Sequence, residues 1–525
     1  MKITSIIILL FLSFFILGCE NSNNKNPNEL VYASTKDIRD INPHLYRGEM
    51  AAQNMVFEPL IIDTKDGIKP WLAKSWEIKD DGKSYIFNLK ENVSFSDGTK
   101  FDANIVKKNF DAILKNRVRH AWLELVNEIK STEVIDQYTF KINLKNPYYP
   151  TLTELAMTRP FRFISPKCFK NGGTKEGVAC YKGTGPWILE EHEKNNFALF
   201  QRNKNYWNKI PKIETIKWRV IPNHQSILLA LQKNEIDLIF GSDGDMINLN
   251  AFSAIEKKNN LKTLLSNPIA SRAILLNTNK PIIKDLKIRE ALSYAVNKEA
   301  IVKGILNNSE TVAKTLFSKT TPYCNIDLKT KEFNPNKSKE ILKNLGWELK
   351  EDKIRYKKDM PLRLKLYYNA NNAQEKTISE YIQSNFKDIG VDLKIIGEEK
   401  QSFLDRQQSG DFDLQYGLSW GIPYDPQSFI SSWRRPAHGD YQAQVGLKRK
   451  NWLDKTVKSI LIEPNEEKRK ELYTQIFTYI NDQNVYIPLS YSRTKVVFNP
   501  RVKGVTFNIS QYEIPFEKMY FENIK

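Results

Sequence analysis

Residues 417–440, reading GLSWGIPYDPQSFISSWRRPAHGD, gather the side-chain types of a small-molecule site. Trp420 and Tyr424 flank a Pro-rich turn, and His438, one of only five histidines, follows two adjacent arginines. An apolar wall that carries a few convergent polar groups is typical of a binding site for a small molecule. The stretch therefore predicts ligand binding, provided that the fold places it at a cleft.

The same stretch also fits a serine hydrolase motif. The run GLSWG has the G-x-S-x-G pattern around Ser419, and Asp425 and His438 follow in hydrolase order. A nucleophile elbow requires a helix directly after the serine, whereas the prolines that follow disfavour a helix start there. A serine hydrolase is thus a remote alternative, and we expect a binding protein and no enzyme.

The first nineteen residues predict export. An apolar run over residues 6–17 is too short to span a bilayer and fits a secretory signal. The run ends in ILGC, which resembles the lipobox of bacterial lipoproteins, where the cysteine, here Cys19, carries lipid. We therefore expect a signal peptide over residues 1–18 and a lipidated cysteine with a polar tether over residues 19–29. The protein would then lie in the cell envelope, periplasmic or extracytoplasmic, tied to a membrane.

Export changes the meaning of the net charge of +18. In a cytosolic protein this charge would suggest nucleic acid, but that partner is largely absent outside the cytoplasm. The lysines are also spread along the chain, so we expect a solvated basic surface and no nucleic-acid partner.

Export also bears on the cysteines. Cys168 and Cys180 bracket a short Gly-containing loop, and an oxidising compartment would allow them to form a disulfide. Cys324 is left over. The sequence has no CxxC or HExxH spacing, so a metal cage made by the protein alone is not supported.

The elements that must position residues 417–440 are those of an α/β sheet. Alternating apolar residues predict strands over 362–368 and 391–395, and helical spacing over 378–389 predicts a helix between them that Gly390 ends. The two strands should be parallel, and a further strand follows over 412–416. Ligands bind outside the carboxyl ends of such strands, so residues 417–424 should line a cleft.

Nearer the N-terminus, residues 84–89 and 138–144 alternate as strands and residues 103–114 are typical of a helix. We expect Arg119 in a continuing helical segment, where its neighbour His120 would face another direction.

Several segments carry a family resemblance. They are AKSWEIKDDGKSYIFNLKENVSFSDGTKFDANIVKKNFD (73–111), GTGPW (183–187), RNKNYW (202–207), REALSYAVNKEAI (289–301) and YIPLSY (486–491). Together they resemble family-5 solute-binding proteins, the peptide and nickel receptors of ABC importers. The resemblance implies a two-lobed α/β fold, like the type II periplasmic binding proteins, with the ligand cleft between the lobes. Lobe I would comprise residues 30–266 and 488–525, with a subdomain inserted at about 56–184, and lobe II residues 267–487.

Within that family the chain most resembles the nickel-binding receptors. The shared segments are RHAWLEL (119–125), TRPFRFISP (158–166), INPHLY (41–46), SWGIPYDP (419–426) and the downstream His438. In these receptors nickel(II) arrives with a small carboxylate chelator such as histidine, and the permease of the importer is the partner. The resemblance implies the following roles: Arg119 and Arg159 for the carboxylates, Trp122, Trp420 and Tyr424 for the wall, His438 for the metal, and Tyr46 and Met50 in the lining.

These roles are chemically coherent. Guanidinium pairs with carboxylate in a bidentate manner, and imidazole suits nickel. A chelator that supplies the remaining ligands explains why the sequence has few. We expect a monomer, and the alternative function is an oligopeptide or haem receptor of the same fold.

Overall fold

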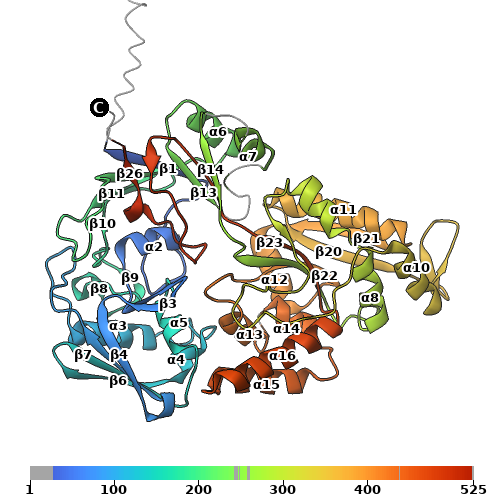
Figure 1. Cartoon of the computed structure of the whole chain (residues 1–525), viewed down its shortest axis with the longest axis horizontal. Helices are drawn as coiled ribbons and strands as arrows, with labels where there is room; N and C mark the ends of the chain where they lie inside the picture. The colour runs from blue at the N-terminus through green and yellow to red at the C-terminus, as the bar shows by residue number, and fades with distance from the viewer. Residues whose placement is uncertain (1–27, 242–245, 247–248, 257–259, 437, 523–525) are drawn as a thin grey trace, which may run out of the picture.

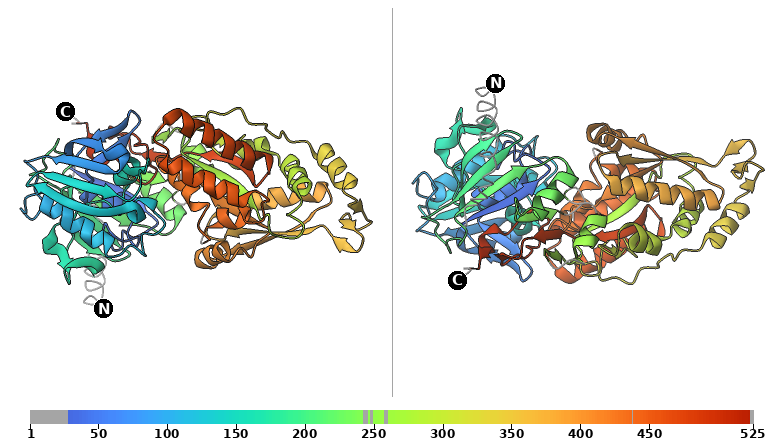
Figure 2. Two further views of the ribbon diagram at one scale, coloured as in Figure 1. Left: turned by 90° about the horizontal axis from the view of Figure 1, so that it is seen from below. Right: turned by 90° about the horizontal axis from the view of Figure 1, so that it is seen from above.

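The computed structural model describes residues 28–241, 246, 249–256, 260–436 and 438–522. The predicted signal peptide, Cys19 and most of the tether lie outside these residues. The described residues form two α/β lobes, which lie side by side in Figure 1 and are seen from below and above in Figure 2.

The first lobe is built on a seven-stranded sheet of order β10-β11-β12-β1-β13-β24-β14. Its strands are β1 (Glu29–Ser34), β10 (Trp187–Glu193), β11 (Phe197–Arg202), β12 (Thr215–Val220), β13 (Leu238–Gly241), β14 (Lys262–Leu265) and β24 (Lys495–Phe498). The central strand β1 is parallel to both neighbours and has an unbroken run of buried residues, as a strand covered on both faces requires. Helices α2 (Met50–Val56), α6 (His224–Gln232) and α7 (Leu249–Glu256) belong to the same lobe.

A four-stranded antiparallel sheet of order β4-β5-β7-β6 lies beneath the first sheet in Figure 1. Its strands are β4 (Ala73–Lys79), β5 (Ser84–Leu89), β6 (Ile129–Asp136) and β7 (Thr139–Leu144), and the helices beside it are α3 (Ala103–Leu114), α4 (Glu124–Glu128) and α5 (Thr151–Ala156). The Asp102 side chain caps α3 by accepting a hydrogen bond from the Ile105 amide, and Phe110 of α3 packs on Phe140 of β7. The predicted helix over residues 103–114 and the two predicted strands are confirmed.

Short antiparallel strand pairs complete the first lobe. They pair β2 (Ile61–Thr64) with β3 (Gly67–Pro70), β8 (Phe169–Lys170) with β9 (Gly173–Val178), and β25 (Val502–Lys503) with β26 (Tyr520–Phe521).

The second lobe is built on a six-stranded sheet of order β16-β23-β15-β22-β20-β21. Its strands are β15 (Ala270–Leu276), β16 (Thr311–Val312), β20 (Arg363–Asn369), β21 (Asp392–Glu398), β22 (Leu414–Leu418) and β23 (Tyr486–Ser492). Helix α11 (Ala373–Asp388) connects β20 to β21, and these two strands are parallel, so the predicted strand-helix-strand unit is confirmed. Gly390 has a φ of 84°, the left-handed conformation in which glycine commonly ends a helix.

The remaining elements of this lobe are mostly helical. They are α8 (Leu286–Ala295), α9 (Lys298–Ala300), α10 (Pro335–Asn344), α12 (Lys400–Ser409), α13 (Gln427–Ser432), α14 (Gly439–Gln444), α15 (Lys450–Ile462), α16 (Glu466–Asp482) and a small sheet of β17 (Glu348–Leu349), β18 (Arg355–Lys357) and β19 (Met360–Pro361).

The described chain passes between the two large sheets twice, from β14 to β15 and from β23 to β24. The two crossing segments are bonded to each other. The Ser266 amide donates to the Thr494 carbonyl at 3.0 Å, and the Ile269 amide donates to the Ser492 carbonyl at 2.9 Å. Because β23 pairs with β15 and β16, the second sheet holds the chain through Ser492, beyond the boundary at residue 487 that the resemblance implies.

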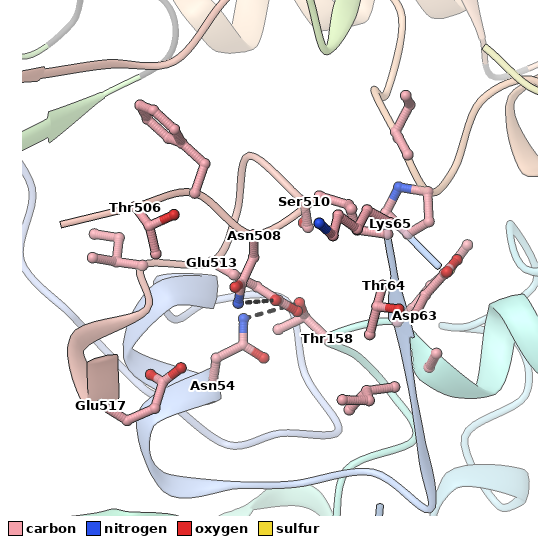
Figure 3. Close-up of a pocket in the computed structure, with 18 of the residues that line it drawn as sticks. Asn54, Asp63, Thr64, Lys65, Thr158, Thr506, Asn508, Ser510, Glu513 and Glu517 are labelled. Carbon is pink, nitrogen blue, oxygen red and sulfur yellow. Dashed lines mark hydrogen bonds between the residues drawn. The ribbon is translucent and has the colours of Figure 1, made fainter. Parts of the chain in front are cut away.

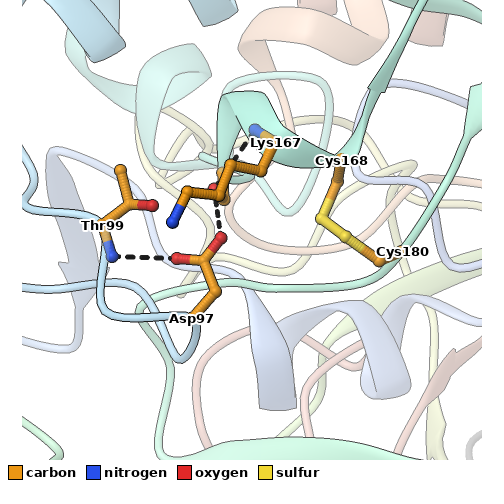
Figure 4. The surroundings of a disulfide bond; sticks show 6 residues. Asp97, Thr99, Lys167, Cys168 and Cys180 are labelled. Atoms are coloured by element: carbon orange, nitrogen blue, oxygen red, sulfur yellow. Dashed lines mark hydrogen bonds between the residues drawn. A yellow bond between two sulfur atoms is a disulfide. The ribbon is translucent and has the colours of Figure 1, made fainter.

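A disulfide joins Cys168 to Cys180 in the first lobe, with their Cα atoms 4.9 Å apart (Figure 4). The Ala179 amide also donates to the Cys168 carbonyl at 2.8 Å. The bridge lies beside the turn at Asp97, whose carboxylate accepts a hydrogen bond from the Thr99 amide. Cys324 is a buried free thiol of the second lobe.

Candidate functional site

Tyr46 lies at the centre of the predicted ligand residues. It follows β1 in a bend, and its hydroxyl oxygen accepts a hydrogen bond of 2.7 Å from the Trp122 indole. The same oxygen lies 2.6 Å from Nδ1 of His120. Two bonds therefore fix the orientation of the Tyr46 ring.

The segment that carries these partners is not the helix that we expected. Residues 115–122 form successive turns between α3 and α4, so Arg119 and His120 can both contact Tyr46 from adjacent positions. The expectation that His120 faces away was therefore wrong, and it is fully buried. Burial, together with the charge of Arg119, lowers the pKa of His120 to about 4.

Both predicted arginines lie at the Tyr46 ring. Cζ of Arg119 is 5.2 Å and Cζ of Arg159 is 5.1 Å from the ring centroid. Nη1 of Arg159 donates to the Gly48 carbonyl at 3.1 Å, and burial lowers the pKa of Arg159. No ion pair found within the described ranges joins either guanidinium to a carboxylate. Two such groups beside one ring favour an anionic ligand, because bidentate binding of a carboxylate suits guanidinium.

The aromatic wall comes from both lobes. Trp122 of the first lobe meets Trp420 of the second edge to face, with ring centroids 5.6 Å apart. Trp420 in turn lies 6.5 Å from Tyr424 and 5.8 Å from His438, measured between ring centroids. Trp420 follows β22, so the predicted stretch does lie beyond the carboxyl end of that strand and faces the other lobe.

His438 precedes α14 and is half-buried. Burial, and then the charge of Arg435, lowers its pKa. At neutral pH the imidazole is therefore uncharged and keeps a lone pair, which is the form that binds a metal.

Met50 is not joined to this group by any of the contacts described for the chain. It begins α2, four residues after Tyr46, and is half-buried.

A cavity of about 930 Å³ adjoins the cluster (Figure 3). Its polar lining includes Asn54, Asp63, Thr64, Lys65, Thr158, Thr506, Asn508, Ser510, Glu513 and Glu517. The second lobe contributes Ile422, Pro423 and Tyr424. Tyr424 alone of the predicted ligand residues lines this cavity, so it links the cavity to the cluster.

Sequence reasoning missed Arg162, which also lines the cavity. Its guanidinium is buried, donates to the carbonyls of Thr158 and Ala156, and lies 3.5 Å from a carboxylate oxygen of Glu513. Arg162 follows Arg159 by three positions in the sequence R-P-F-R, but one sequence alone does not indicate that this second arginine is buried at a cavity.

Within the described residues, no three His, Cys, Asp or Glu side chains gather closely enough to hold a metal ion. None of the helices there has both the length and the apolar character needed to cross a bilayer.

Comparison with protein families decides the class of the chain. Residues 67–441 match the family model described as bacterial extracellular solute-binding proteins, family 5. The chain belongs to family 5 of these binding proteins. The family consists of solute-binding proteins rather than enzymes, and the two-lobed fold predicted from the sequence is confirmed.

Family-5 relatives match along almost the whole chain. The nickel-binding periplasmic protein of Escherichia coli (strain K12) is 42% identical over 96% of this chain and 97% of its own. The dipeptide-binding protein of the same organism is 26% identical, with 94% of each chain covered. The crystal structure of NikA from Brucella suis in complex with Fe(III)-EDTA matches with a TM-score of 0.92 at 42% identity, covering 94% of this chain and all of that one.

The hydrolase motif of this family-5 chain is a structural turn. The Ser419 hydroxyl donates to the Asp425 carboxylate and accepts a hydrogen bond of 2.8 Å from the Ser271 amide. The His438 ring instead packs on Trp420, so the Ser-His contact that a nucleophile needs is not formed among the described residues.

Proposed function

We propose that this family-5 protein captures nickel(II) as a complex with a small carboxylate chelator such as histidine and delivers it to the permease of an ABC importer. The observation that carries the proposal is the convergence of Arg119 and Arg159 on the Tyr46 ring, with no carboxylate partner among the described residues. Two guanidinium groups supply a fixed, positively charged site for the carboxylates of a chelate.

The other residues complete the site. Trp122, Trp420 and Tyr424 would pack on the flat faces of the chelate, and Tyr46 and Met50 would lie behind it. Neutral His438 would offer one ligand to the metal, while the chelator brings the rest. A chelator that brings most of the metal ligands is compatible with the described residues, among which no three His, Cys, Asp or Glu side chains gather at one point.

Two relatives support the proposal. A receptor with 42% identity is named for nickel binding, and the Brucella relative was crystallised with Fe(III)-EDTA, a metal held by a polycarboxylate chelator. Both ligands combine a metal with the kind of anionic periphery that paired arginines bind.

The remaining parts of the proposal concern location and assembly. The receptor would be a monomer, lipid-anchored through Cys19 in the cell envelope, with the lobes divided near residue 266 and just after Ser492.

An oligopeptide or haem receptor is the second candidate. A dipeptide-binding relative at 26% identity and the cavity of about 930 Å³ favour it.

Isothermal calorimetry on the purified protein tests both candidates. The ligands are nickel alone, L-histidine alone, the two together, Fe(III)-EDTA, haem and a peptide mixture. We expect tight binding only when metal and chelator are both present. Binding of peptides or haem, without heat from nickel plus histidine, would contradict the nickel proposal.

A further inference from the structure

We propose that His120 is a positioning residue for the chelate, which acts through Tyr46 to hold both arginines in place. The inference rests on the proposed function for its ligand, and on the geometry around Tyr46 for its mechanism.

The hydrogen bonds around Tyr46 define the direction of each donor. An indole N–H can only donate, so the Tyr46 oxygen is the acceptor of the 2.7 Å bond from Trp122. The phenol proton then has Nδ1 of His120 as its acceptor at 2.6 Å. Burial and the charge of Arg119 favour the neutral imidazole. We assign its proton to Nε2, because a proton on Nδ1 would leave the phenol proton of Tyr46 without this acceptor.

The surroundings of Nε2 of His120 indicate that stability alone does not explain a histidine at this position. It is buried and has no hydrogen-bond partner among the described residues, although it would carry the proton. An unpartnered buried donor lowers stability, and a leucine at this position would avoid that penalty. We infer that histidine serves here for the acceptor at Nδ1. The charge of Arg119 disfavours an imidazolium at His120, and His44 is a second titratable group near the ring, whose own pKa a charge on His120 would lower.

The Tyr46 ring transmits the effect of this acceptor to the ligand site. Both guanidinium groups lie about equally far from the ring, 5.2 Å and 5.1 Å to its centroid. The negative face of the ring offsets part of the repulsion between the two cations. A ring that loses its fixed orientation therefore disturbs both carboxylate contacts at once, although His120 itself is sealed from the cleft.

Four variants separate this role from simple packing. His120→Leu removes the acceptor at similar volume, and His120→Asn places an amide oxygen near the position of Nδ1. Tyr46→Phe removes the hydroxyl, and a double variant combines Tyr46→Phe with His120→Leu. His224→Leu, at the start of α6, is the control.

The binding probes are nickel with L-histidine, and Fe(III)-EDTA, measured by calorimetry. We expect His120→Leu to raise Kd about tenfold with little change in the thermal midpoint, because the lost acceptor of the Tyr46 proton and the removed unpartnered Nε2–H have opposite effects on stability. His120→Asn should restore most of the affinity. In a protein that already carries Tyr46→Phe, the change His120→Leu should cause no further loss of affinity for the chelates. Unchanged affinity in His120→Leu, or equal additional loss in both backgrounds, would overturn the inference.

Nitrogen-15 NMR of the ligand-free protein tests the inference without any chelate. We expect His120 as the neutral Nε2–H tautomer between pH 5 and pH 8, with an Nδ1 shift that changes in Tyr46→Phe. An Nδ1–H tautomer would overturn the inference even if the chelate binds. If neither chelate binds the wild type, the proposed function fails, and this spectrum still decides whether the His120–Tyr46 bond exists as described.

Discussion

The carboxylate of Glu124 accepts a hydrogen bond of 3.0 Å from Arg434, which is 310 residues away along the chain. Arg435 donates to the same oxygen at 2.9 Å. Glu124 belongs to α4 of the first lobe, and both arginines follow α13 of the second lobe. One carboxylate therefore ties the lobes together beside the candidate site.

Glu124→Gln should weaken this tie. We expect a larger radius of gyration by small-angle scattering and a Kd for the nickel-histidine complex raised by about threefold to tenfold, since the pair is partly solvent-exposed. Glu128→Gln is the matched control, because Glu128 lies in the same helix and bonds to Asn146 of its own lobe. Identical scattering and affinity in the two variants would show that the ion pair does not hold the lobes.

Arg159→Ala should weaken chelate binding more than His438→Ala does. Arg159 is fixed by Tyr46 and the Gly48 carbonyl, and its loss would leave a carboxylate of the ligand without a charged partner. We expect a rise in Kd of about tenfold to a hundredfold for Arg159→Ala and a smaller rise for His438→Ala, by calorimetry.

Arg47→Ala is the control for this comparison, because it removes the same charge from an exposed neighbour of Tyr46. An equal effect of Arg47→Ala and Arg159→Ala would point to general electrostatic attraction instead of a specific contact.

Much of the scaffold could be predicted because local patterns specify it. Residues 103–114 fold as the helix that their spacing predicts, and the alternating leucines of β20 place Leu364 and Leu366 in the core. The position of Trp420 just after β22 could also be predicted, because both the alternating strand and the Pro-rich turn that follows it can be recognised in the sequence.

The contacts between distant segments could not be predicted. His120 meets Tyr46 across 74 residues, and Glu124 meets Arg435 across 311. Whether residues 115–122 continue a helix or turn is decided by this packing, since arginine and histidine fit either conformation. A resemblance supplied the candidate ligand residues, but it carried no information about the residues that contact and orient them.

Stability should fall as pH rises through the titration of Glu154. This buried carboxyl accepts hydrogen bonds from Tyr148, the Leu125 amide and Ser428, and burial raises its pKa from the ordinary 4.5 to about 7. Between these values the folded protein binds more protons than the unfolded chain, so the free energy of unfolding decreases with increasing pH.

Glu154→Gln mimics the protonated acid and should remove this slope. We expect the free energy of unfolding of the variant, relative to that of the wild type, to rise by up to about 3 kcal/mol from pH 5 to pH 8, measured by urea denaturation. Glu91→Gln, an exposed carboxylate of the same lobe, should leave the slope unchanged. A constant difference between Glu154→Gln and wild type across this range would contradict the assignment.

Removal of the disulfide should cost stability but not ligand affinity. The bridge spans a sequence separation of 12, and loss of a loop of this size lowers the free energy of unfolding by about 2–3 kcal/mol in the chain-entropy model. We expect this loss in the double variant Cys168→Ser, Cys180→Ser, and in reduced wild type. A double variant as stable as the oxidised wild type would show that the bridge does not form in solution.

The bonded crossings at Ser266–Thr494 and Ile269–Ser492 restrict the relative motion of the lobes. Two adjacent ribbons bend readily out of their common plane, but shear between them would break the hydrogen bonds that join them. If one lobe moves against the other, both crossing segments must therefore bend together. Two dyes, one on each lobe, would report such a coupled movement as an optical signal, which is the basis of a biosensor.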